Sequence, residues 1–256
     1  MLFDLRGKRR RLVQVTFATL ALLFLVGFLG FGIGVGGGPG GIFDALGISN
    51  SDGGGSATDQ INSEIDAANA KLAKNPNDTK ALLKLAQNEF LLAKTGVQTD
   101  PNTGAPVSVS NDAHTDLGDA ADAWEKYLKV NKGKPDVTVA FDMINVYVLL
   151  QDADGAAQAQ RIVAEDQPSV NSYGQLALFE YAGGDIEAGD AASDKALSLA
   201  SKTEAQGIKP QLAQARKQGI KLQEAQEKAK KQAGENATKP GSNPLQNPFG
   251  VPGTTP

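Results

Sequence analysis

The chain contains no cysteine and only one histidine, His114, among its 256 residues. The lack of cysteine excludes a disulfide framework, thiolate metal sites and a cysteine nucleophile. A single histidine leaves almost no material for histidine-based zinc sites or for Ser-His-Asp catalysis. His114 lies among polar residues, and we expect it to be exposed in a loop or in the first turn of a helix. The sequence therefore predicts no metal, no cofactor and no enzymatic activity.

Two ligand-binding loops are also missing. The glycine clusters lack the Lys and Ser/Thr of G-x-x-x-x-G-K-[ST], which excludes a phosphate-binding loop of that type. Residues 100–104 begin like a calcium loop, with oxygen donors two positions apart. An EF-hand loop needs Gly at position 6 and Glu at position 12, where this chain has Ala105 and Asn111. We expect a turn there.

The net charge of −4 hides three regions of different sign. Residues 1–41 carry five basic groups and one acid, and residues 209–256 carry eight basic groups and three acids. Residues 42–208 therefore have a net charge of −13. An acidic body repels phosphate backbones, so nucleic acid is not an expected partner.

The N-terminal region predicts a membrane anchor. Residues 12–35 contain no charged side chain and follow a basic segment, residues 1–11. A helix of that length measures about 36 Å, enough to cross a hydrocarbon core of about 30 Å. The basic residues place the N-terminus in the cytoplasm and the rest of the chain outside the cell membrane. The alternative is a cleaved signal peptide, whose apolar core is normally about 7–15 residues long. Gly30 and Gly34 form a G-x-x-x-G pattern that can pack two such helices, but glycine is common in membrane spans, so the pattern alone does not predict a dimer.

The remaining chain divides by composition into a linker, a body and a tail. Residues 36–57 are rich in Gly, Ser and Asp and predict a flexible linker. Residues 236–256 are rich in Pro and Gly and predict a disordered tail. Residues 58–235 carry apolar residues at helical spacing, with helices expected over Ala81–Lys94, Val137–Gln151 and Ser172–Ala182. Val107–Ser110 alternates but is too short to predict a strand, so the fold class is all-α.

A repeat of about 34 residues runs through this body. Met143, Ile144 and Tyr147 are followed by Ala156, Val163 and Pro168. Tyr173, Leu176 and Ala177 are followed by Gly189 and Ala196. Leu82, Leu85 and Ala86 are followed, after an insertion over Thr95–Leu117, by Ala120, Trp124 and Leu128. In this pattern residues 60–200 resemble the tetratricopeptide repeat (TPR) family, whose unit is a pair of antiparallel helices.

The resemblance implies a short α-solenoid, in which small residues let helices approach and large residues fill the grooves. Trp124 occupies a large-residue position, so we expect it in the core rather than in a ligand site with Tyr127. A polar capping helix over residues 210–232, with Pro210 in its first turn, would close the array. Its Lys228, Lys230 and Lys231 are expected to be solvated surface. The open alternative is an irregular helical bundle.

The resemblance also implies a function. TPR arrays bind proteins or peptides in a groove lined by the first helix of each repeat, where this chain has the polar residues Asn88, Asn145 and Gln175. We therefore expect a non-enzymatic, membrane-tethered interaction scaffold in the cell envelope. The alternative is a chaperone-like helper of envelope protein assembly or translocation, because the basic N-terminus, residues 28–32 and the Gly-rich exit also resemble membrane-anchored periplasmic folding factors. The chain has no room for the isomerase domain of such factors.

Overall fold

The computed structural model describes residues 54–100 and 106–237. The predicted cytoplasmic segment 1–11 and membrane span 12–35 lie outside these residues, as do most of the linker 36–57 and most of the tail 236–256. Within the described part, no helix is long and apolar enough to cross a membrane. The predicted body is therefore the part of the chain whose fold can be compared with the sequence.

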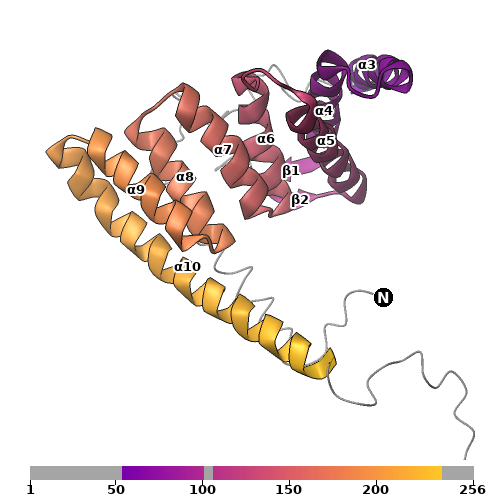
Figure 1. The fold of residues 1–256 in the computed structure, drawn as a ribbon. Helices are drawn as coiled ribbons and strands as arrows, with labels where there is room; N and C mark the ends of the chain where they lie inside the picture. Colours follow the sequence, from indigo (N-terminus) through magenta and orange to yellow (C-terminus); the bar gives the residue numbers. More distant parts are fainter. Residues whose placement is uncertain (1–53, 101–105, 238–256) are drawn as a thin grey trace, which may run out of the picture.

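This body is a series of helical hairpins (Figure 1), which confirms the all-α, solenoid-like prediction. Each helix packs against the next one along the chain, and α4 also packs on α6 and α8 on α10. The helices are α3 (Gly54–Lys74), α4 (Thr79–Thr95), α5 (Asn111–Val130), α6 (Val137–Leu150), α7 (Ala153–Asp166), α8 (Val170–Gly183), α9 (Ile186–Leu199) and α10 (Lys202–Ala237). The three expected helices correspond to α4, α6 and α8.

Short polar side chains begin six of these helices. The side chain of the residue before each one accepts a hydrogen bond from a backbone N–H of the first turn, and these residues are Asp78, Ser110, Asp136, Asp152, Ser169 and Asp185. Each such cap contributes about 1 kcal/mol, and a carboxylate also interacts favourably with the helix dipole. Some of the acidic residues that give the body its negative charge therefore serve to cap helices.

The insertion between α4 and α5 differs from the expected loop. It forms an antiparallel hairpin of β1 (Val97–Thr99) and β2 (Pro106–Val109), so the alternating segment Val107–Ser110, too short to predict a strand, overlaps one. The helix that follows begins at Asn111 and is capped by Ser110, which shortens the insertion predicted over Thr95–Leu117. At the base of the hairpin the N–H of Ser110 donates to the carbonyl of Gly96 at 3.0 Å, so the two ends of the insertion lie together.

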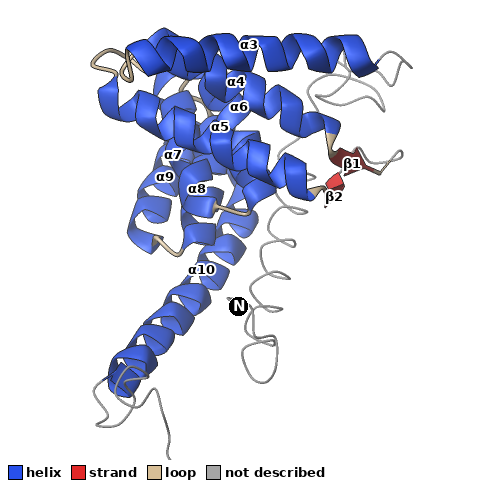
Figure 2. Cartoon of the chain, turned by 90° about the vertical axis from the view of Figure 1, so that its right-hand side faces the viewer, coloured by secondary structure: helices blue, strands red, loops and turns tan. Residues whose placement is uncertain are grey.

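The C-terminal helix is longer than predicted. It begins at Lys202, so Pro210 lies inside α10 and not in its first turn. Its start is stabilised by a reciprocal pair of bonds: the N–H of Ser201 donates to Glu204 and the N–H of Glu204 donates to Ser201. Figures 1 and 2 both show the far end of α10 extending beyond the other helices.

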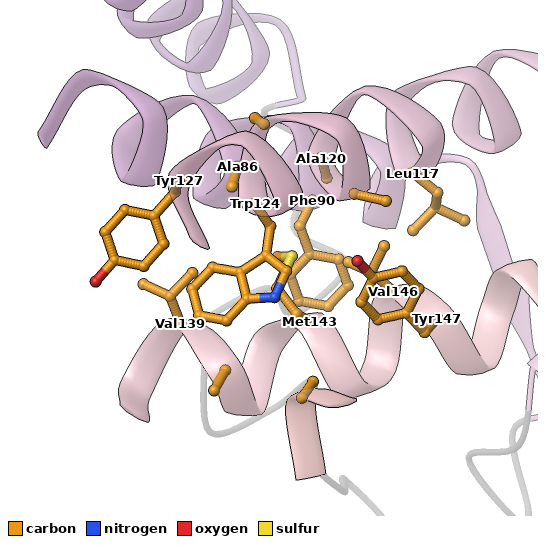
Figure 3. Packing of buried hydrophobic residues seen from close by; sticks show 14 of the residues in the cluster. Ala86, Phe90, Leu117, Ala120, Trp124, Tyr127, Val139, Met143, Val146 and Tyr147 are labelled. Carbon is orange, nitrogen blue, oxygen red and sulfur yellow. The ribbon is translucent and has the colours of Figure 1, made fainter. Parts of the chain in front are cut away.

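The core has two parts that meet at α7. In the first part, α4, α5 and α6 enclose Trp124, which is fully buried and stacks on Tyr127 with ring centroids 5.2 Å apart. Figure 3 shows the Trp124 ring between α5 and α6, beside Phe90 and Met143. Its expected place in the core is confirmed. The second part, shared by α7, α8, α9 and α10, is built mainly from alanine around Tyr181.

Candidate interaction surfaces

The exposed face of α6 carries the most accessible aromatic side chain of the described residues. Phe141 is 44% exposed, and its carbonyl accepts a hydrogen bond from the Asn145 amide at 3.2 Å. Asn145 is half-buried one turn later on the same face. An exposed ring beside an anchored amide provides both an apolar contact and a hydrogen-bonding group for a polypeptide.

A buried lysine and a carboxylate lie next to this face. Lys94 of α4 is 6% exposed, and its ammonium lies 5.6 Å from the centre of the Phe90 ring. Burial lowers the pKa of Lys94, while the charge of Asp142 on α6 opposes that shift. Burial raises the pKa of Asp142, and Lys94 in turn opposes this change. The two charges therefore connect α4 with α6 beside Phe141.

The three polar residues noted on the first helices of the repeats lie in different surroundings. Asn88 is 2% exposed and faces Glu64 of α3, so it belongs to the packing of α3 on α4. Gln175 of α8 is half-buried and donates to Asn171 of its own helix at 3.4 Å. Of the three, only Asn145 lies beside an exposed aromatic ring.

A cleft of about 500 Å³ lies between α3 and α4. Ala67, Ala68 and Ala81 give it apolar walls, and Lys71 and Lys80 are among its charged residues. Lys84, also in its lining, forms an ion pair with Glu64 at 2.8 Å. The sequence did not indicate this cleft, because its residues are ordinary surface positions on two separate helices.

Four carboxylates gather where α4 meets α5. Glu89 comes from α4, and Asp112, Asp116 and Asp119 come from α5; we call this group the acidic junction. Burial, followed by the charges of Asp119 and Asp116, raises the pKa of Glu89 to about 7. Burial and the neighbouring Asp119 and Asp112 also raise the pKa of Asp116. The sequence alone indicated no site at these four residues.

His114 itself is exposed in the first turn of α5, as expected. Over residues 54–100 and 106–237, no group of three or more histidine, aspartate or glutamate side chains has an arrangement that could hold a metal ion.

Compared with protein-family models, with curated proteins and with solved structures, the chain matches none. Its function therefore has to be inferred from its own residues and their arrangement.

Proposed function

We propose that this chain is a membrane-tethered, non-enzymatic scaffold that binds a protein or peptide partner on the face formed by α4, α6 and α8. The observation that carries the proposal is the exposed Phe141 beside Asn145, on a helix that buries Met143 and Tyr147 on its other side. An aromatic ring left accessible next to a fixed amide is typical of protein-binding surfaces.

A repeated contact supports the proposed kinship with TPR proteins. Tyr147 of α6 packs against Gly155 of α7, where an added Cβ would come within 2.2 Å of the ring. Tyr181 of α8 packs in the same way against Gly189 of α9, where the distance would be 2.4 Å. The second pair follows the first by 34 residues, the length of a TPR unit. Two hairpins built on one contact favour a solenoid repeat over an irregular bundle.

Site-specific photo-crosslinking tests the binding face in the full-length chain in cells. A photoreactive residue at Phe141 should capture one discrete partner, whereas the same residue at Glu165, exposed on α7, should not. Equal capture from both positions would contradict the proposed face. Capture of many unrelated, unfolded chains from Phe141 would instead favour the chaperone-like helper.

The proposed topology places residues 1–11 in the cytoplasm, residues 12–35 in the membrane and the helical body outside. Protease added to intact spheroplasts should then digest the body and leave the extreme N-terminus protected. A mature protein that begins near Gly36 would show instead that the apolar segment is a cleaved signal peptide.

A further inference from the structure

We propose that the acidic junction is a second docking surface, which binds a Lys/Arg-rich segment of a partner protein. The surface is formed by Glu89, Asp112, Asp116 and Asp119 and is independent of the face around Phe141. The proposal rests on the missing counter-charge, on the burial of Glu89 and on the spacing of the three aspartates.

The junction holds negative charge that the described chain does not neutralise. None of the four carboxylates belongs to an ion pair formed among the described residues. Neighbouring carboxylates of like charge repel one another and destabilise the fold. Repulsion of this kind, which brings no evident stabilisation inside the domain, is expected at functional sites.

The position of Glu89 is a second observation, beside the missing counter-charge, that points to a ligand. Glu89 is 8% exposed, it faces Asp116 and Asp119, and it receives no hydrogen bond from the part of the chain that the structure describes. A largely buried carboxylate beside two carboxylates of the same charge is costly, whereas an ammonium or guanidinium group would provide both a hydrogen-bond donor and the opposite charge. A cation from a partner would therefore offset the repulsion at Glu89.

The spacing of the aspartates favours a polypeptide over a metal ion. Asp112, Asp116 and Asp119 stand one turn apart on α5 and extend over about 10 Å. A calcium ion needs its oxygen ligands to converge at about 2.3–2.6 Å, and the described carboxylates form no such group. A row of charges along a helix instead matches several basic side chains of one segment.

Binding of a basic segment should release a proton from the junction. Of the described residues, the charged groups that act on Glu89 are Asp119 and Asp116 of α5, and none comes from α3 or α6, the other helices packed on α4. Because the pKa of Glu89 is about 7, this carboxyl is about half protonated at neutral pH. A bound cation lowers its pKa, so the affinity rises as the pH increases from about 6 to about 8.

The test is calorimetric titration of the full-length chain, in a non-ionic detergent, with an oligo-arginine peptide. The triple variant Glu89→Gln, Asp116→Asn, Asp119→Asn should weaken binding by about tenfold or more. The control is Glu165→Gln, Asp166→Asn, Asp194→Asn, which removes the same charge from exposed positions on α7 and α9. The control should change the affinity less than about threefold.

A second readout separates a specific site from general attraction to an acidic body. Titrations in phosphate and in Tris buffer, which differ in ionisation enthalpy, should show proton release that disappears in Glu89→Gln. Equal weakening by both triple variants, or no proton release, would overturn the proposal. Displacement of the peptide by calcium would identify a cation site instead. A dimer that dissociates in the junction variant would make a second copy of the chain the occupant. Each result is interpretable, because removing repelling charges is not expected to unfold the domain.

Discussion

The two parts of the core hold the same hairpin architecture together by different means. Around α4, α5 and α6, large side chains such as Trp124, Tyr127 and Met143 fill the space between helices. Around α8, α9 and α10, alanine and glycine let the helices approach closely. An α-solenoid can therefore keep one geometry while its packing changes from one repeat to the next.

Ion pairs and side-chain hydrogen bonds also connect the closely packed helices of the second part. Arg161 of α7 forms an ion pair with the buried Glu180 of α8. Asp190 of α9 accepts a hydrogen bond from the Tyr181 hydroxyl at 2.8 Å and a bidentate pair from Arg216 of α10 at 2.7 and 2.9 Å. The Arg216 hydrogen bonds lower the pKa of the Asp190 carboxyl. The first part should thus be most sensitive to loss of side-chain volume, whereas added volume should disturb the tyrosine–glycine contact of each part, Tyr147 with Gly155 and Tyr181 with Gly189.

Truncation of Trp124 should have the largest effect of the variants considered. Trp124→Ala removes a fully buried ring and should reduce the free energy of unfolding by about 3–5 kcal/mol. Urea unfolding followed by circular dichroism measures the change. Phe141→Ala is the control, because this exposed ring should contribute less than about 1 kcal/mol. A loss below about 1 kcal/mol at Trp124 would show that the first part does not depend on large-residue packing.

Enlargement of the packed glycines should have the next largest effect. Gly155→Ala and Gly189→Ala place a methyl group against the ring of Tyr147 or Tyr181 and should each cost about 1–3 kcal/mol. Gly207→Ala in α10 is the matched control. Apart from the backbone of its own turn, no atom lies within 4 Å of the added Cβ at Gly207, so helix propensity should make this variant about 0.5–1 kcal/mol more stable. Thermal unfolding of all three variants would show whether the tyrosine contact or helix propensity decides the sign.

The contribution of the acidic junction to folding stability should change with pH in the direction opposite to that of Asp190. Folding raises the pKa of Glu89 from an ordinary value of 4.5 to about 7, so the native state binds more protons between these values. Its contribution to stability is present below about pH 4.5 and is lost as the pH rises through about 7. Asp190, with its lowered pKa, instead contributes above its ordinary pKa and loses that contribution in acid.

Glu89→Gln should remove the first of these pH dependences. At about pH 8 the variant should be on the order of 1–2 kcal/mol more stable than the parent chain, and near pH 4.5 the two should be nearly equal. Urea unfolding across this pH range measures the difference. A variant less stable than its parent at about pH 8 would mean that the Glu89 carboxylate has a stabilising partner.

Much of the helical framework could be predicted from the sequence, because the apolar residues repeat at helical spacing and the capping residues mark the turns. Gly184, for example, ends α8 with a φ of 89°, a left-handed conformation that glycine adopts readily. The same kind of signal at Ser201–Glu204 marks the start of α10, whereas the position of Pro210 predicts a start at residue 210.

The acidic junction could not be predicted in this way. Glu89 and Asp116 belong to different helices and are separated in the sequence by the insertion, so no local pattern connects them. Their meeting depends on the register in which α4 packs on α5, and that register is set by contacts such as those of Ala86 and Trp124 in the core. A cluster of side chains from two packed helices can therefore be identified only from the three-dimensional structure.

Removal of the β-hairpin should have the smallest effect. Gly96 and Ser110 are already joined by a hydrogen bond, so replacing residues 97–109 with a short Gly-Ser turn leaves both helix ends in place. Of the replaced side chains whose burial is described, Val97, Asp100 and Val109 are half-buried, and Val107 is 63% exposed. The loss should be about 1 kcal/mol, a shift of a few degrees in melting temperature, with the helical circular dichroism retained.

Because Gly96 and Ser110 stay, the cap on α5 and the acidic junction that follows it should also survive, and binding of oligo-arginine should be unchanged. Collapse of the helical signal would show that the hairpin, rather than the Trp124 core, holds α4 and α5 together.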